Sequence, residues 1–216
     1  MKLDKQAVLF DLDGTLVDNR ASFQKAYRAL CAAYPDLLSP DDRRAEQLMT
    51  EFYRMSLMRE SYEALCRRTE CALPPMEAFH DAWCRIYAEN AVPFPWSMDT
   101  LDYLRTGGYR IGLVTNGDAF RQWTKIRSSG LAPMFDHIVV SGDQPFEKPD
   151  PQIYALALSG LGVAAEHALF VGDTVGTDIE GAKRAGIDSL WLTEQPTNSV
   201  GATYIARDVS FLKTIL

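Results

Sequence analysis

Two aspartates stand directly after an apolar run near the start of the sequence, in the stretch VLFDLDGTLVD at 8–18. The run at 8–10 is typical of a buried strand, and Asp11 and Asp13 follow it with one leucine between them. Carboxylates this close repel each other and raise each other's pKa unless a positive charge intervenes. The pair therefore predicts a site that binds a cation and uses a carboxylate in chemistry.

Acids, one lysine and short hydroxyl or amide side chains also follow three later apolar runs. In open parallel α/β sheets, ligands bind outside the carboxyl ends of the strands. We therefore expect these side chains to meet Asp11, Asp13 and Thr15 at one edge of a sheet. They are Thr115 and Asn116 after the run 110–115, Lys148 in the loop after 137–141, and Asp173 and Asp178 after 168–172.

A hard divalent cation would relieve the repulsion between such acids. Mg²⁺ takes oxygen ligands and suits one or two carboxylates together with a substrate phosphate. One carboxylate is then able to act as a nucleophile, and a second is able to protonate the leaving group and later activate water. Lys148 and the metal would neutralise charge on a transferring phosphoryl group.

The order of elements along the chain predicts an α/β fold with a Rossmann-like parallel sheet. Apolar runs alternate with helical stretches, and such runs are typical of strands covered on both faces. The run at 8–10 would be a central strand and 189–193 the last one. The other expected strands are 110–115, 137–141 and 168–172, with helices at 97–106, 118–130, 150–161 and from about 178 to 186.

The pattern changes between the first strand and the rest of this core. Phe23, Tyr27 and Leu30 recur at helical spacing, as do Phe79 and Trp83, and nothing in the segment resembles a strand. We therefore expect an inserted all-helical domain at 19–92 and a catalytic core made of 1–18 and 93–216. The aromatic stripes are expected to be packing rather than a ligand cage.

Composition and charge restrict the class of protein. The net charge of −7 argues against binding to nucleic acid, and no apolar run reaches the length of a membrane span. Cys31, Cys66, Cys71 and Cys84 form no C-x-x-C pair, and the histidines are scattered, so reduced thiols are expected rather than a zinc site. We expect a cytoplasmic enzyme with a small phosphorylated metabolite as its partner, and the sequence leaves the oligomeric state open.

Four motifs in order resemble those of the haloacid dehalogenase-like hydrolases. The stretch DLDGT resembles the first motif, VTNG the second, EKPDP the third and GDTVGTD the fourth. The helical insert is similar to the cap that these enzymes carry between the first two motifs. The resemblance covers the whole chain and implies a Mg²⁺-dependent phosphatase acting on a small phosphomonoester, such as a nucleotide, a sugar phosphate or phosphoglycolate.

The resemblance also implies roles for individual residues. Asp11 would be the nucleophile and a Mg²⁺ ligand, and Asp13 the general acid and base, with its backbone carbonyl on the metal. The dehalogenases of the family lack an acid at the position of Asp13, so its presence here points to phosphoryl transfer. Thr115 would bind the phosphoryl oxygens, and Lys148 would pair with both the phosphate and the nucleophile. The other implied positions are Asp173 and Asp178 for the metal. Thr15 and Asn116, which follow strand ends, are further expected substrate-binding residues.

Several alternatives stay open at this point. Asp13 and Gly14 could form a simple turn, Lys148 could be a solvated lysine, and Asp178 could orient a metal-bound water or only cap a helix. An EF-hand is excluded, because Leu16 stands where that loop requires glycine. The alternative functions are a phosphomutase of the same fold and a phosphate-binding regulatory protein with little turnover.

Overall fold

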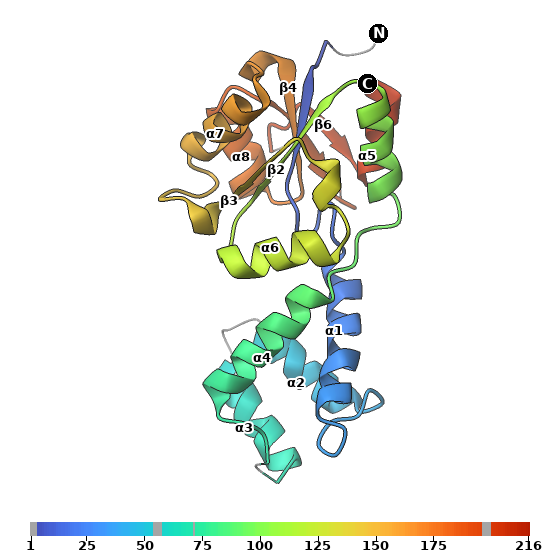
Figure 1. Cartoon of the computed structure of the whole chain (residues 1–216), viewed down its shortest axis with the longest axis vertical. Coiled ribbons are helices and arrows are strands. Elements are labelled where there is room, and N and C mark those ends of the chain that lie inside the picture. Colours follow the sequence, from blue (N-terminus) through green and yellow to red (C-terminus); the bar gives the residue numbers. More distant parts are fainter. Residues whose placement is uncertain (1–3, 54–57, 71, 196–199) are drawn as a thin grey trace. The chain divides into compact units, whose positions relative to one another are not determined.

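The structure is a computed structural model that describes residues 4–53, 58–70, 72–195 and 200–216 (Figure 1). Its contacts divide the chain into two compact units. The first unit combines Met1–Asn19 with Val92–Leu216, and the second is Arg20–Ala91. The expected boundaries of the insert, at 19 and 92, lie within one residue of this division.

A six-stranded parallel sheet forms the centre of the first unit, in the order β3-β2-β1-β4-β5-β6. β1 is central, as predicted, and Phe10 stands in register with Leu113 of β2 and Val171 of β4. All of β1 is buried, which explains why the run is apolar throughout. The strands are β1 (Ala7–Phe10), β2 (Arg110–Thr115), β3 (His137–Val140), β4 (Ala168–Gly172), β5 (Asp188–Leu192) and β6 (Tyr204–Ala206).

Helices cover both faces of this sheet, with α7 and α8 on one side and α5 on the other (Figure 1). Local sequence fixes where two of them begin. The Asp118 carboxylate accepts from the backbone N–H of Arg121 at the start of α6, and that of Asp150 accepts from Gln152 at the start of α7. The helices are α5 (Ser97–Thr106), α6 (Ala119–Ser128), α7 (Pro151–Leu161), η4 (Val175–Ile179), α8 (Glu180–Arg184) and α9 (Leu212–Ile215), with 3₁₀ turns η1 (Ala132–Met134), η2 (Ser141–Asp143), η3 (Ala165–His167) and η5 (Val209–Phe211).

Two expectations about the core are wrong. The strand near 189–193 is not the last, because β6 follows it and pairs with β5. β6 has only three residues, none of them fully buried, so it lacks the apolar run that identifies a core strand. The helix expected from about 178 begins earlier, with a π-helical turn at Val175–Ile179 that leads into α8.

Helices and their connecting loops make up the described part of the second unit, which contains no strand. Its helices are α1 (Asn19–Ala33), α2 (Arg43–Tyr53), α3 (Met58–Arg68) and α4 (Met76–Glu89). The aromatic stripes form its hydrophobic core, as predicted, with Tyr27, Phe52, Phe79 and Trp83 almost fully buried. Phe52 and Phe79 meet at 5.6 Å between ring centroids, tilted by 56°.

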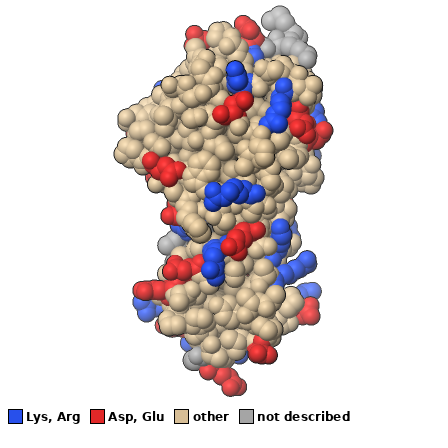
Figure 2. Space-filling model, viewed as in Figure 1, with Lys and Arg blue, Asp and Glu red and all other residues tan. Residues whose placement is uncertain are grey.

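The cysteines and surface charges add to this description. Cys31, Cys66 and Cys84 are free thiols, and Cys71 lies outside the described residues. Basic and acidic side chains are interspersed over the face drawn in Figure 2. Among the described helices, none is both long enough and apolar enough to cross a membrane.

Candidate active site

The ends of the central strands bring the predicted acids together. β1 lies between β2 and β4, so the residues that follow these strands meet at one edge of the sheet. Asp11 comes directly after β1, Thr115 ends β2, and Asp173 comes directly after β4. The backbone N–H of Asp11 donates to the carbonyl of Val171 at 2.9 Å, which ties the first loop to β4.

Lys148 is the positive centre of this edge. Its Nζ donates to Oδ1 of Asp11 at 2.6 Å and to Oδ1 of Asp178 at 2.8 Å. Lys148 is 3% exposed, and Asp11 and Asp178 are 7% and 1% exposed. A charge this deeply buried is costly unless it is paired. Lys148 is therefore part of a buried ion-pair network and not a solvated surface lysine.

Burial and neighbouring charges shift the pKa values of this network. Burial raises the pKa of Asp11 to about 7, with the charge of Asp178 adding to the rise and the ammonium of Lys148 opposing it. Burial alone would lower the pKa of Lys148, but the charges of Asp11 and Asp178 outweigh it and hold the pKa above its usual value. Burial and the charge of Asp178 also raise the pKa of Asp173. The site holds more acid than its single lysine can balance.

The donor set at this edge fits a divalent cation. Asp11, Asp173 and Asp178 each offer a carboxylate oxygen, and these oxygens lie within 4.8 Å of one another. Three carboxylates against one ammonium leave an excess of negative charge. Mg²⁺ is bound by carboxylate oxygens and supplies the charge that is missing, so these residues fit it.

Close backbone approaches shape this cluster. Gly14 has φ +84°, and a Cβ at this position would overlap the carboxylate of Asp173, so only glycine suits the turn. A Cβ at Gly172 would likewise overlap the side chain of Asp178. The indole N–H of Trp191 in β5 donates to the carbonyl oxygen of Asp173 at 2.9 Å. The loop after β1 and the loop after β4 are therefore packed closely against each other.

Asp178 lies inside its helical turn and does not cap it. The N-cap position is Thr174, and the Asp178 carboxylate reaches back to accept from the Thr174 backbone N–H at 3.0 Å. Its other oxygen accepts from Lys148. The reading of Asp178 as a simple helix cap is wrong, because the helix starts three residues before it.

The Asp13 carboxylate stands apart from the acid cluster and contacts α6. Nζ of Lys125 lies 3.0 Å from its Oδ1 and 2.8 Å from its Oδ2. Nε2 of Gln122 donates to the same Oδ2 at 3.0 Å. The side chain of Asp13 is 28% exposed, so the carboxyl group is held from one side and open to solvent on another.

The hydroxyl side chains of the site differ in their surroundings. Oγ1 of Thr115 lies 2.6 Å from Nε2 of Gln122. Oγ1 of Thr15 is buried and makes no hydrogen bond with the described residues. Thr15 lines a cavity of about 250 Å³ that Gly14, Trp96 and Asp173 also border. A buried hydroxyl without a partner next to an acid cluster fits a group that awaits a ligand.

Asn116 uses its side chain on the protein itself. Its amide nitrogen donates to the carbonyl of Lys148 at 2.8 Å, and its amide oxygen accepts from the Lys148 backbone N–H at 2.9 Å. This two-point contact fixes the loop that delivers Lys148. Substrate binding by Asn116 stays a prediction, and its side-chain contacts in this structure fit a positioning role.

Sequence reasoning missed Gln122 and Lys125. Both are buried, at 3% and 7% exposure, and they stand three residues apart on one face of α6. The available signal was a polar pair on the inward face of a helix that starts just after a strand end. Lys125 lies beside the apolar Ile126 on that face. Because lysine is almost never fully buried unless it is paired, this position indicated that Lys125 has a partner within the site.

Comparison with known proteins agrees with this arrangement of motifs. The model of the haloacid dehalogenase-like hydrolase family matches residues 5–186. A glyceraldehyde 3-phosphate phosphatase from Methanopyrus kandleri is 33% identical over 193 residues, covering 84% of this chain and 81% of that protein. A phosphoglycolate phosphatase from Caulobacter vibrioides is 28% identical over 211 residues, covering 94% and 87%.

A solved structure is also similar over nearly its full length. It is the hydrolase YfnB from Bacillus subtilis, crystallised with magnesium bound. The two proteins are 25% identical, the alignment covers 98% of each chain, and the TM-score is 0.77.

Proposed function

This chain belongs to the haloacid dehalogenase-like hydrolases and is a hydrolase of phosphoric monoesters, and we propose that it acts on a small phosphomonoester through an aspartyl-phosphate at Asp11. The observation that carries this proposal is the position of Asp11. It is buried directly after the central strand, 2.6 Å from the ammonium of Lys148 and grouped with Asp173 and Asp178. Oδ1 of Asp11 accepts from Lys148, and we assign the attack on phosphorus to the other carboxylate oxygen, Oδ2.

In the first half of the reaction, a carboxylate oxygen of Asp11 attacks the phosphorus of the substrate. The bond between phosphorus and the leaving oxygen breaks, and that oxygen takes a proton from the carboxyl group of Asp13. Lys148 and the hydroxyl of Thr115 donate hydrogen bonds to the phosphoryl oxygens as charge moves onto them. The products of this half are the free alcohol and a phosphorylated Asp11.

In the second half, Asp13 acts as the base. It removes a proton from a water molecule whose oxygen attacks the phosphorus of the aspartyl-phosphate. The bond between phosphorus and the Asp11 oxygen breaks, which releases inorganic phosphate and restores both carboxyl groups to their starting states. The 28% exposure of the Asp13 side chain supports this role, because the attacking water must reach it.

Asp11, Asp173 and Asp178 would hold Mg²⁺, together with the backbone carbonyl of Asp13. When bound, the ion supplies positive charge that favours the ionised form of Asp11 and balances the phosphoryl oxygens. This matters because the pKa of Asp11 is about 7 without an ion, so much of the nucleophile would otherwise be protonated at neutral pH. Lys148 contributes in the same direction from the protein side.

Short aliphatic phosphomonoesters form the substrate class that we favour. The relatives act, by their names, on glyceraldehyde 3-phosphate and on phosphoglycolate, which are small and carry a polar group close to the phosphate. Nucleotides and larger sugar phosphates belong in the same screen, because the family hosts many substrates on one fold.

Phosphate release from a panel of phosphomonoesters tests the proposal. The panel holds glyceraldehyde 3-phosphate, phosphoglycolate, sugar phosphates and nucleotides, each with Mg²⁺ and with a chelator. Asp11→Asn removes the nucleophile, and Asp102→Asn is the matched control, because Asp102 is an exposed aspartate on α5.

We expect metal-dependent release by the native protein and by the Asp102 variant, and a loss of about 10⁴-fold or more in the Asp11 variant, as for other nucleophiles. Release that persists in the Asp11 variant would show that the nucleophile is another group. An isomeric sugar phosphate without free phosphate would identify a phosphomutase.

A further inference from the structure

Helix α6 carries two buried polar side chains that the reaction described above does not use. We propose that Lys125 and Gln122 are positioning residues that hold the carboxyl group of Asp13 where it exchanges a proton with the leaving group. This role rests on the proposed function, since it acts through Asp13 as general acid. Both residues contact the Asp13 side chain.

The contacts fix the Asp13 carboxyl group in both position and orientation. Lys125 reaches both carboxylate oxygens, at 3.0 and 2.8 Å, and Gln122 adds a contact of 3.0 Å to Oδ2. Two donors from one helix face therefore set where the carboxyl plane lies. A carboxyl group on a loop with 28% exposure would otherwise rotate among several staggered positions.

Gln122 also links Asp13, the proposed proton donor, to Thr115 and Asn116 at the end of β2. Its Nε2 lies 2.6 Å from Oγ1 of Thr115 and 2.8 Å from the carbonyl oxygen of Asn116. The same amide thus contacts the end of β2 and the loop after β1. Gln122 therefore links the position of the Asp13 carboxyl group to that of Thr115.

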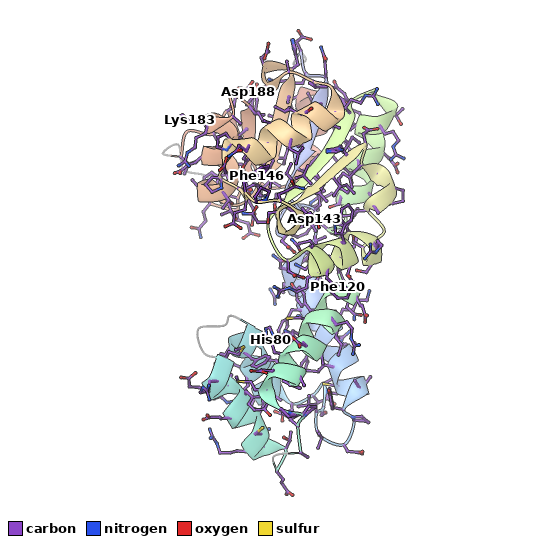
Figure 3. The ribbon with its side chains drawn as sticks, turned by 60° about the vertical axis from the view of Figure 1, so that its left-hand side comes forward. His80, Phe120, Asp143, Phe146, Lys183 and Asp188 are labelled. Atoms are coloured by element: carbon purple, nitrogen blue, oxygen red, sulfur yellow. The ribbon has the colours of Figure 1, made fainter. Side chains whose placement is uncertain are left out.

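General energetics gives no reason to expect this arrangement for stability alone. A buried ion pair is often no better than apolar residues of similar size, and the ammonium of Lys125 must leave water to reach its place. α6 has other anchors, since Ile126 is fully buried and the indole N–H of Trp123 donates to Asp143 at 2.7 Å. Figure 3 labels Asp143 and Phe120 in this part of the core. A buried ammonium at Lys125, which costs desolvation free energy, is therefore better explained by a role in the reaction.

The role makes a specific prediction about leaving groups. An alkoxide needs a proton as the bond to phosphorus breaks, whereas p-nitrophenolate leaves without one at neutral pH. A displaced Asp13 should therefore slow phosphorylation of Asp11 by an alkyl phosphate and spare phosphorylation by p-nitrophenyl phosphate. The parameter that reports this step is kcat/KM, because it covers the reaction up to the first irreversible step.

The experiment compares kcat/KM for the best alkyl phosphate of the panel and for p-nitrophenyl phosphate, in the intact protein with Mg²⁺. Lys125→Met removes the donor, and Lys125→Arg keeps a charged donor. Arg127→Met is the matched control, because it removes one positive charge from an exposed position of the same helix. Circular dichroism melts establish that each variant is folded, and Lys125→Gln replaces the methionine variant if that one is not.

We expect Lys125→Met to lower kcat/KM for the alkyl phosphate by about 10- to 100-fold, the usual effect of losing a group that orients a reacting side chain. The value for p-nitrophenyl phosphate should fall by less than about 3-fold on the same reasoning. Lys125→Arg should recover part of the loss, and Arg127→Met should change neither value. Lys125→Met added to Asp13→Asn should cause no further loss for the alkyl phosphate.

Equal losses on the two substrates, or no loss on either, would overturn the positioning role while leaving the proposed function intact. A further loss in the Asp13→Asn background would also overturn it, because Lys125 would then act by another route. Failure of the proposed function gives a different result, since the native protein would then release no phosphate or Asp13→Asn would keep full activity on the alkyl phosphate.

Discussion

Replacing Lys148 by methionine tests whether a single buried ammonium balances the acids of this site. Lys148 lies 2.6 Å from Asp11 and 2.8 Å from Asp178, and the side chains of Lys148, Asp11 and Asp178 are 2%, 9% and 1% exposed. Methionine has a similar length and no charge, so the variant leaves two buried carboxylates without their partner. Removing one partner of a buried ion pair costs about 3–5 kcal/mol.

The loss of stability in the Lys148→Met variant should depend on pH, and the raised pKa of Asp11 determines whether it grows or shrinks as pH rises. Its pKa in the folded protein is about 7, above the value of 3.8 for the unfolded chain, so the folded state binds this proton more tightly. The stability that comes from that proton is fully present below pH 3.8 and is lost as pH rises through about 7. Without Lys148, which lowers the pKa of Asp11, the pKa rises further and the dependence steepens. At pH 5.5, protonation of Asp11 therefore offsets part of the cost that appears in full at pH 8.

Denaturant unfolding with a chelator present, at pH 5.5 and pH 8, measures both effects. We expect a loss of about 3–5 kcal/mol at pH 8, equivalent to about 6–20 °C in Tm for a chain of this size, and a smaller loss at pH 5.5. Lys183→Met is the control, because Lys183 is an exposed lysine of α8, labelled in Figure 3. A Lys148 variant as stable as this control, or one whose loss is the same at both pH values, would refute the assignment of Lys148 as the counter-charge of Asp11.

Three further predictions concern the metal and the loops around it. Mg²⁺ should raise Tm more at pH 8 than at pH 5.5, because below about pH 7 a proton on Asp11 competes with the ion; an equal rise at both values would contradict this. Gly14→Ala should cost more than about 1 kcal/mol, since φ is +84° and the new Cβ would overlap Asp173, and it should weaken Mg²⁺ binding in a calorimetric titration. Asn116→Ala should lower the free energy of unfolding by about 1–3 kcal/mol, because it leaves the backbone of Lys148 without two hydrogen-bond partners; a neutral result in denaturant unfolding would show that water replaces them.

The strand ends were predictable because a simple physical pattern marks them. The four buried residues of Ala7–Phe10 cannot be followed by two acids in a covered sheet unless the acids lie outside its edge, which placed Asp11 correctly after β1. The helix of Pro151–Leu161 was equally clear from its capping aspartate and first-turn proline. In both cases the local signal and the tertiary environment agree.

Other features lacked a local signal. β6 is short and only partly buried, so its pairing with β5 depends on contacts that the sequence does not display. The π-helical turn before α8 contains Asp178, which accepts from the Thr174 backbone and from Lys148, and the second of these contacts joins segments that are distant in the sequence. The helical pattern places Lys125 on a face with Ile126, but it does not identify the partner, Asp13, which lies more than a hundred residues away along the chain.

Trapping the phosphorylated enzyme tests the central claim most directly. The native protein is mixed with its best substrate and Mg²⁺, quenched in acid during turnover, and treated with borohydride, which reduces an aspartyl-phosphate to homoserine. Tandem mass spectrometry then locates the reduced residue. We predict homoserine at position 11, in substrate-treated protein only, and its absence from the Asp11→Asn variant. Turnover with no reduced residue, or with the label at another aspartate, would contradict the account.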